Sequence, residues 1–328
     1  MGNELVYILL VNYNSWPHTL ECLSSIFKNE YKQYKVIVCE NSSTDDSWER
    51  MLEWKGKNRG VLCFEEGEKG LYELPPADES IIFIKNKTNK GFAGGINTAM
   101  NHAFLDVRCK YLWVLNNDTI IERTALKALV KEMESDEEIG MCGSTILYYD
   151  EPHMVQALGG SSYNKWMGVT RYIGNGKQGN ELKNVRKEKV LEKMDCLAGA
   201  SMLLRRSLVE ETGPFSEEYF LYYEEMDYAQ RIKGRYKLGY APDSVVYHKE
   251  GASIGGSVNN PANKSRTADF YSLRNKLLFT KKYFSRYLPT VYLSFLPSIL
   301  LRIMRGQYSR VPVIFKIIFN KNQASDPS

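Results

Sequence analysis

Four short apolar runs divide the first 115 residues, and polar turns with helical patterns lie between most of them. The runs are Leu5–Val11, Tyr34–Cys39, Ile81–Ile84 and Tyr111–Leu115. A strand-length run that is apolar at every position suits a strand buried on both faces of a parallel sheet. Helices that connect such strands form right-handed crossovers. The order therefore predicts an α/β fold with a mostly parallel sheet flanked by helices.

The second half of the chain is less regular. It predicts a helix at Thr124–Ser135, a strand at Met141–Tyr148 and a further helix at Phe220–Arg231. Residues Gly159–Lys193 are polar and rich in Gly, Asn and Lys, and a loop of this length in a compact domain is usually a lid or binding loop. Asn58–Ser80, rich in Gly, Glu and Pro, is predicted to be a surface insertion.

The positive charge of the chain is concentrated at its C-terminal end. The net charge is +4, yet the residues from Lys264 onward hold 12 Lys or Arg and 2 Asp or Glu. Basic residues among Leu, Ile, Phe and Tyr suit an anionic membrane surface; the alternative is a solvated basic helix pair packed on the domain. The uncharged run Tyr287–Leu301 is shorter than the ~20 residues that span a bilayer, so it is expected to lie in the interface.

The cysteines and the N-terminal residues indicate a cytoplasmic protein. The six cysteines are scattered and include no Cys-x-x-Cys pair, as expected for reduced thiols. Residues Met1–Val11 lack a basic segment followed by a long apolar one, so no secretory signal is predicted. The mild net charge gives no indication of nucleic acid as a partner.

The fourth apolar run ends abruptly at Asn116-Asn117-Asp118. A strand that ends in Asp delivers an oxygen ligand to the carboxyl edge of the sheet, where open α/β sheets bind ligands. A divalent metal that bridges a diphosphate needs only one or two protein oxygens. The alternative is a helix cap or an Asx turn. His248, after the strand-like run Tyr240–Tyr247, is a second candidate metal ligand, although a lone histidine is more often structural.

A glycine-rich turn, Gly91–Gly95, precedes a predicted helix at Ile96–Phe104. Glycines let the backbone approach a ligand closely, and the start of a helix presents free N–H groups. The spacing matches neither the dinucleotide pattern GxGxxG nor a Walker phosphate loop. A plain tight turn is the alternative interpretation.

Three acidic residues, Glu224, Glu225 and Asp227, form a cluster after an apolar segment. Adjacent carboxylates repel each other, so one of them is expected to have a raised pKa and to serve as a general base. Arg231, four residues after Asp227, offers a structural ion pair instead. The apolar residues Phe220–Tyr223 argue against a fully solvated acidic face.

Seven segments, in this order, resemble the family 2 glycosyltransferases, especially the rhamnosyltransferase-like branch, which have the GT-A fold. They are Val11–Asn14, Glu40–Asp45, Asn89–Asn97, Leu115–Thr119, Leu197–Arg206, Gly213–Phe215 and Tyr223–Asp227. The resemblance covers about residues 5 to 280 of the chain. It implies an α/β, Rossmann-like mixed sheet that is mostly parallel and flanked by helices, followed here by a basic amphipathic helical tail.

The resemblance also implies a role for each matching residue. On the donor side, it places Val11, Asn12 and Tyr13 in the first nucleotide-binding loop. It places Glu40 at the nucleoside, a position where the family usually has Asp. It places Asn89, Gly91 and Asn97 along the base and ribose, and Asn116 and Asn117 at the diphosphate. On the acceptor side, it places Gly199 and Ala200 at the floor of the acceptor pocket, with Asp227 also predicted to contact the acceptor. Asp118 and His248 are the implied metal ligands. Either Glu224 or Glu225 is the implied base.

The expected enzyme is an inverting, metal-dependent hexosyltransferase. It moves a sugar from a dTDP- or UDP-sugar, dTDP-rhamnose among the candidates, to a hydroxyl of a saccharide or lipid-linked acceptor in cell-surface polysaccharide synthesis. Mg²⁺ or Mn²⁺ stabilises the departing diphosphate. Residues 1–265 are the predicted catalytic domain, with a nucleotide-sugar half at 1–120 and an acceptor half at 121–265. Residues 266–328 are predicted helices that attach the protein peripherally to the inner face of the membrane.

Two other functions remain open at this level. A nucleotidyltransferase that makes sugar nucleotides would use a similar sheet, but it needs an early Gly-rich loop with Arg and Lys, and Leu10–Trp16 has neither. A non-catalytic carbohydrate-binding protein is the second alternative. It is distinguished by whether Asp118, Glu224 and Glu225 converge on one cleft.

Overall fold

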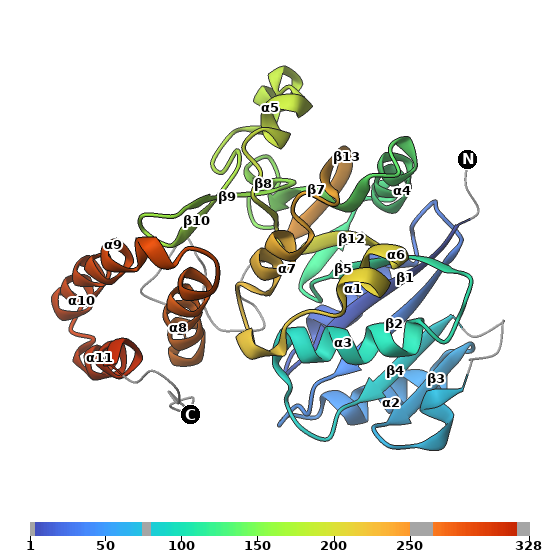
Figure 1. The fold of residues 1–328 in the computed structure, drawn as a ribbon. Coiled ribbons are helices and arrows are strands. Elements are labelled where there is room, and N and C mark those ends of the chain that lie inside the picture. Colours follow the sequence, from blue (N-terminus) through green and yellow to red (C-terminus); the bar gives the residue numbers. More distant parts are fainter. Residues whose placement is uncertain (1–3, 74–79, 250–264, 320–328) are drawn as a thin grey trace.

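The computed structural model describes residues 4–73, 80–249 and 265–319, which form a ten-stranded mixed sheet with helices on both faces (Figure 1). The strand order is β3-β4-β2-β1-β5-β12-β7-β13-β6, and β8 pairs with β7. The strands are β1 (Leu5–Asn12), β2 (Tyr34–Glu40), β3 (Val61–Glu65), β4 (Ile81–Lys85), β5 (Cys109–Leu115), β6 (Thr119–Ile121), β7 (Ile139–Tyr148), β8 (Val155–Leu158), β12 (Ser201–Arg205) and β13 (Lys237–His248). Strands β1 to β5 pair in parallel, whereas β12 is antiparallel to both β5 and β7. The α/β prediction is confirmed.

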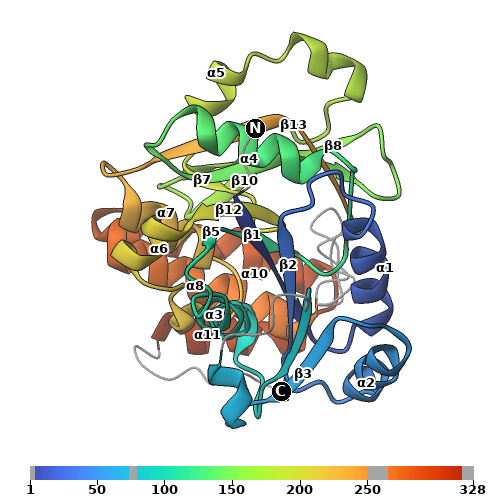
Figure 2. The same cartoon turned by 90° about the vertical axis from the view of Figure 1, so that its right-hand side faces the viewer.

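Successive side chains along β1 point to opposite faces of the sheet and pack into two separate hydrophobic cores. Val6, Ile8 and Leu10 belong to one core and Tyr7 and Leu9 to the other, and all five are fully buried. The first core includes residues from α1 (Trp16–Ile26), α2 (Ser47–Lys57) and α4 (Ala125–Ser135). The second includes residues from α3 (Gly91–Ala103), α6 (Arg206–Thr212) and α7 (Glu224–Ile232). Figure 2 shows α1 and α2 on one side of the sheet and α3 and α6 on the other.

Several predicted boundaries differ from the structure. The predicted insertion Asn58–Ser80 contains the edge strand β3 and a 3-10 turn η1 (Lys69–Tyr72). Helix α3 begins at Gly91, five residues earlier than expected. Helix α7 begins only at Glu224, because Phe220, Tyr222 and Tyr223 have positive φ angles of 60°, 68° and 74°.

The long polar segment Gly159–Lys193 is not a structureless loop. It contains the hairpin β9 (Gly160–Asn164) and β10 (Val169–Tyr172), then η2 (Gly179–Asn184) and α5 (Lys187–Leu191). Strand β9 also pairs with β11 (Cys196–Leu197), which makes a small three-stranded sheet. This sheet lies between the main sheet and the C-terminal helices (Figure 1).

The C-terminal helices form their own apolar cluster beside the hairpin (Figure 1). They are α8 (Arg266–Tyr283), η5 (Ser285–Tyr287), α9 (Leu288–Leu293), α10 (Phe295–Met304), η6 (Tyr308–Arg310) and α11 (Val311–Phe319). Phe270, Val291, Phe295 and Ile314 are buried in this cluster. The 20 residues of Ser285–Met304 are long and apolar enough to cross a membrane by length and composition, which is weak evidence for a span.

Candidate active site

A chain of side-chain hydrogen bonds joins the ends of two parallel strands. Asn117, after β5, donates from Nδ2 to Oγ1 of Thr19 at 2.8 Å. Thr19 Oγ1 in turn donates to Oδ1 of Asn12, the last residue of β1, at 2.7 Å. All three side chains are buried. Two motifs that lie about a hundred residues apart in the sequence are thus held together at the carboxyl edge of the sheet. Thr19, on α1, gave no signal in the sequence.

Asp118 and His248 meet at the same edge, from β6 and β13, which pair in antiparallel register. Nε2 of His248 lies 3.2 Å from Oδ1 of Asp118 and 3.3 Å from Nδ2 of Asn116. Nδ1 of His248 is 2.9 Å from Oε1 of the buried Gln156 on β8. With this amide oxygen as the acceptor, Nδ1 carries the imidazole proton and Nε2 presents its lone pair toward Asp118. Gln156 was missed because nothing in the sequence relates β8 to the metal motif.

The pair fits a divalent metal that is also bound by a diphosphate. Oδ1 of Asp118 is buried, and the side-chain nitrogen nearest to it is Nε2 of His248 at 3.2 Å. Burial acts to raise the pKa of Asp118, but the charge and hydrogen bond of His248 in its protonated form outweigh it, so the pKa lies below its ordinary value. A metal bound to the lone pair of Nε2 would take the place of that proton. Among the described residues no third His, Cys, Asp or Glu joins the pair. Two protein ligands are enough for a metal that takes its remaining oxygens from phosphates and water.

The segment after β2 is shaped by Glu40 and Asn14. The carboxylate of Glu40 is fully buried and accepts hydrogen bonds from the backbone N–H groups of Ser42 and Ser43, at 3.1 and 2.7 Å. Oγ of Ser43 then accepts the N–H of Asn14 at 2.9 Å. These bonds connect the loop after β1, which follows Val11 and Asn12 and begins with Tyr13, to the loop after β2. The first contacts of Glu40 are therefore with its own loop, and its predicted contact with a nucleoside stays a prediction.

The glycine-rich turn is held by protein contacts. Gly91 has a φ of +69°, and a Cβ there would lie 2.3 Å from the carbonyl oxygen of Phe220. Asn89 accepts the N–H of Gly91, and Asn97 donates to Phe215 O and Glu217 Oε1, both at 2.9 Å. Oδ1 of Asn97 also accepts the Phe215 N–H at 3.0 Å. These bonds fix α3 against the segment that leads to α7, a structural role that the sequence did not indicate.

The two glutamates at the start of α7 differ in their exposure. Glu224 is buried and its Oε2 has no hydrogen-bond partner among the described residues, whereas Glu225 is half-buried. Burial, together with the Glu225 charge, raises the pKa of Glu224 well above its ordinary value. Burial raises the pKa of Glu225 to about 7. The more exposed Glu225 therefore loses its proton more readily than Glu224, and it is the better placed of the two to act as a base.

Asp227 is fully buried and surrounded by donors. Its carboxylate accepts hydrogen bonds from Arg231 at 2.8 Å, from Lys282 and Tyr283 at 2.7 Å each, and from Tyr219 at 3.2 Å. Burial opposes ionisation, but these donors together hold the pKa of Asp227 below its ordinary value. The bonds place Asp227 in a structural network, which leaves its predicted contact with the acceptor without support.

The segment 196–200 connects the metal edge to the glutamates. Asn116 donates from its backbone N–H to the carbonyl of Ala200 at 3.0 Å. Strand β11 contacts α7, and burial together with the nearby Glu225 carboxylate raises the pKa of Cys196. A Cβ added at Gly199 would meet no heavy atom within 4 Å, so space is open beside it. The segment thus contacts both candidate centres, and the role of Gly199 and Ala200 as the floor of an acceptor pocket stays a prediction.

Comparison with known proteins gives the class to which this fold and site belong. The model of the glycosyl transferase family 2 matches residues 7–213, which is more than half of the chain. The chain belongs to the family 2 glycosyltransferases. This result agrees with the resemblance found in the sequence motifs and does not favour the nucleotidyltransferase alternative; the rhamnosyltransferase-like branch stays a prediction.

Curated relatives match parts of the chain. One is the Escherichia coli UDP-Glc:alpha-D-GlcNAc-diphosphoundecaprenol beta-1,3-glucosyltransferase WfaP, 28% identical over 134 residues, which are 41% of this chain and 43% of that protein. Another is the Escherichia coli UDP-Glc:alpha-D-GlcNAc-diphosphoundecaprenol beta-1,3-glucosyltransferase WfgD, 26% identical over 172 residues, which are 50% of this chain and 56% of that protein. The matched region therefore spans about half the length of these relatives.

Solved structures identify the fold. The mannosyltransferase PcManGT of Pyrobaculum calidifontis, in complex with GDP-Man and Mn²⁺, superposes with a TM-score of 0.57 at 14% identity over 97% of this chain and 88% of that one. GalNAc-T7 with UDP, GalNAc and Mn²⁺ gives a TM-score of 0.61 at 14% identity over 88% of this chain and 49% of that one. The chain has the GT-A fold. At this identity the likeness concerns the fold alone.

Proposed function

We propose that this glycosyltransferase transfers a sugar from a nucleotide-sugar with inversion at the anomeric carbon, and that Glu225 is the base. Glu225 removes the proton of the acceptor hydroxyl as that oxygen forms its bond to the anomeric carbon and the nucleoside diphosphate departs. The exposure of Glu225 beside the buried Glu224 is the observation that carries this assignment, and the raised pKa of Glu225 agrees with it. Burial and the Glu225 charge favour the protonated form of the neighbouring Glu224, which limits the negative charge beside the base.

Asp118 and His248 are the residues that we propose hold a divalent metal, Mg²⁺ or Mn²⁺. Support comes from the buried Oδ1 of Asp118, from the lone pair on Nε2 of His248, and from the 3.2 Å between these atoms. Such a metal would neutralise charge that develops on the departing diphosphate. Asn116 and Asn117 hold this edge in place through Ala200 and Thr19, and Gln156 orients the imidazole.

The donor is proposed to be a UDP- or dTDP-sugar, dTDP-rhamnose among them, and the acceptor a saccharide, either free or linked to a lipid. The printed activities of WfaP and WfgD, a UDP-sugar donor and a diphosphoundecaprenol acceptor, support this class. The proposed role is in the synthesis of a cell-surface polysaccharide. A non-catalytic carbohydrate-binding protein remains the alternative that an activity assay excludes.

The donor site is tested by calorimetric titration with UDP, dTDP and GDP, with and without Mn²⁺. We expect one nucleotide to bind, and to bind more tightly with the metal. In Asp118→Asn the metal should no longer strengthen binding, while Asp150→Asn, an exposed residue after β7, should behave as the parent protein. Equal metal dependence in Asp118→Asn and the parent would reject Asp118 as a ligand.

The C-terminal helices are proposed to dock on an anionic membrane at the cytoplasmic face. Helices α9 and α10 carry large apolar side chains that are exposed, among them Leu293, Leu296 and Leu300 at 62%, 60% and 58%. Residues 266–319 contain ten Lys or Arg and one acidic residue. An exposed apolar surface rimmed by positive charge is the pattern of an interfacial helix.

This docking is tested by sedimentation with vesicles of phosphatidylglycerol and phosphatidylcholine. The variant Leu296→Ser with Leu300→Ser should lose most of its vesicle binding and keep its nucleotide affinity. Val107→Ser is the matched control, because Val107 is 85% exposed on the catalytic part of the chain. If the double variant sediments like the parent, the helices are not the membrane contact.

A further inference from the structure

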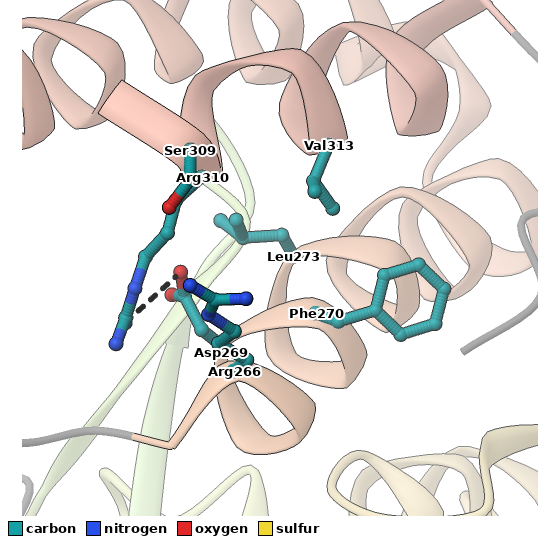
Figure 3. A pocket seen from close by; sticks show the side chains of 7 residues that line it. All are labelled: Arg266, Asp269, Phe270, Leu273, Ser309, Arg310 and Val313. Carbon is teal, nitrogen blue, oxygen red and sulfur yellow. Dashed lines mark ion pairs between the residues drawn. The ribbon is translucent and has the colours of Figure 1, made fainter. Parts of the chain in front are cut away.

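Helices α8 and α11 and the turn η6 line a cavity of about 120 Å³ (Figure 3). Its lining comes from two segments that are about forty residues apart in the sequence. The lining residues are Arg266, Asp269, Phe270, Leu273, Ser309, Arg310 and Val313. Figure 3 shows the side chains of Arg266, Asp269 and Arg310 gathered at one end and those of Phe270 and Val313 at the other.

The charged end of the cavity has a net positive charge. Asp269 is the one acidic residue in the range 266–319. Its carboxylate is bound by Arg302, at 2.5 and 3.2 Å, and lies 3.6 Å from Arg310. Arg266 forms no ion pair with any described residue. Two guanidinium groups, those of Arg302 and Arg310, therefore pair with one carboxylate, and Arg266 adds a further positive charge to the lining of the cavity.

The other end of the cavity is apolar and continuous with the core of the C-terminal helices. Phe270 and Leu273 are buried members of that core, and Val313 packs against it. Helices α9 and α10, which pack into this core, carry the exposed leucines that we propose contact the membrane. A ligand that matches the whole cavity needs an anionic group with several acceptor oxygens and an apolar chain attached to it. Guanidinium groups bind such tetrahedral oxyanions with charge-assisted hydrogen bonds.

We propose that this cavity binds the phosphate group of an amphiphilic phosphate, a phosphate ester carried on an apolar chain. Two sources share that chemistry: an anionic phospholipid of the membrane, and an isoprenoid diphosphate of the kind that carries a lipid-linked acceptor. None of the residues that line the cavity belongs to the proposed transfer centre, but the role given to the site rests on the proposed membrane docking of the C-terminal helices. Its effect is to fix the C-terminal helices at one depth and orientation in the lipid interface.

The test uses the full chain saturated with UDP and Mn²⁺, so that the donor site is occupied. Calorimetric titrations compare short-chain phosphatidylglycerol, short-chain phosphatidylcholine, farnesyl diphosphate and inorganic pyrophosphate. We expect phosphatidylglycerol or farnesyl diphosphate to bind at least about tenfold more tightly than both phosphatidylcholine and pyrophosphate, since the cavity supplies both charge and apolar contact. Binding of phosphatidylglycerol alone identifies the bilayer as the source, and binding of farnesyl diphosphate alone identifies the isoprenoid carrier.

Two variants connect this binding to the cavity. Arg266→Gln removes a guanidinium from an exposed position and should weaken the preferred ligand about tenfold or more. Val313→Phe should block the apolar end. The matched control is Arg305→Gln, which removes the same charge from the same helices at a residue that does not line the cavity. Equal losses in Arg266→Gln and Arg305→Gln, or pyrophosphate binding as tight as that of the amphiphiles, would overturn the proposal. UDP titration of each variant without amphiphile shows whether the donor site is intact, so failure of one site is distinguishable from failure of the other.

Discussion

The donor edge and the catalytic glutamates are held in place in different ways. At the donor edge, Asn12, Thr19 and Asn117 bond to one another at the ends of neighbouring strands and the start of α1. The glutamates follow a segment of positive φ angles, and its carbonyl groups are held by Asn275, fifty residues later on α8. The donor edge is thus built into the sheet, whereas the base depends on a helix that also belongs to the proposed membrane-docking unit.

The sharpest test of this contrast is Glu225→Gln. Loss of a positioned base typically costs 10²- to 10⁴-fold in rate, so kcat should fall by about that factor. Nucleotide affinity should stay unchanged, because the donor edge does not rely on α7. The measurement is transfer kinetics beside UDP or dTDP titration. Glu192→Gln, at an exposed end of α5, is the control. A comparable loss of nucleotide affinity would show that the two regions are not independent.

The pH dependence of the same residue gives a second readout. Because burial raises the pKa of Glu225 from 4.5 to about 7, the folded protein keeps this proton at pH values where the unfolded chain has lost it. Ionisation therefore lowers the stability of the fold as pH rises from about 4.5 to about 7. Activity should rise as the pH passes the pKa of Glu225, near 7, because only the ionised carboxylate can act as the base. Glu225→Gln should lack both effects, with a melting temperature above that of the parent at pH 8.

The next largest effect is expected from Gln156→Leu. This change removes the acceptor that sets the imidazole tautomer of His248, and loss of such an outer partner typically costs 10- to 100-fold in metal affinity. Metal-dependent nucleotide binding should weaken by about that factor, with nucleotide binding in the absence of metal unchanged. Gln33→Leu, an exposed residue just before β2, at the amino end of that strand, is the control. A metal affinity within twofold of the parent would mean that Gln156 serves only the packing of β8.

The sequence predicted the donor edge better than the rest. Apolar runs that end in polar triplets predict both the parallel strands and the edge at which Asn12 and Asn116–Asp118 meet, because the carboxyl ends of parallel strands share one edge. The family and the fold were also predicted correctly. The roles assigned to individual residues at the site stay predictions. Thr19 and Gln156 could not be found, since a single buried polar residue on a helix or strand has no periodic signal.

The acceptor side was harder to predict for a physical reason. The conformation of residues 220–223 is imposed by contacts from α3, the hairpin β9–β10 and α8, which lie 50 or more residues away. Local propensity favoured a helix from Phe220, and tertiary contacts override it. The same long-range contacts give Asp227 its donors from α8, and they place α8 against the acceptor half of the molecule. A chain division at residue 265 therefore crosses several hydrogen bonds.

The smallest effect, and the finest test of the contrast, is expected from Asn275→Ala. Nδ2 of Asn275 donates to the carbonyl oxygens of Tyr219, Leu221 and Tyr222 at 2.7, 2.8 and 3.0 Å, and its side chain is fully buried. Leaving buried acceptors unsatisfied typically costs ~1–3 kcal/mol, so unfolding should become easier by about that free energy. The control is Ser272→Ala, whose hydroxyl bonds only within α8, to Asp269 O.

Stability alone does not separate a positioning role from a packing role for Asn275. If α8 positions the base, the midpoint of the pH–rate profile should move in Asn275→Ala, because a shifted backbone at Tyr222 changes the burial that sets the pKa of Glu225. Nucleotide affinity should stay within about twofold of the parent, since the donor edge has its own bonds. A destabilised variant with the parental pH midpoint would reduce α8 to a structural support. A shifted midpoint would mean that a displacement of α8, such as one caused by membrane binding, changes the pKa of the catalytic base and leaves the donor edge unchanged.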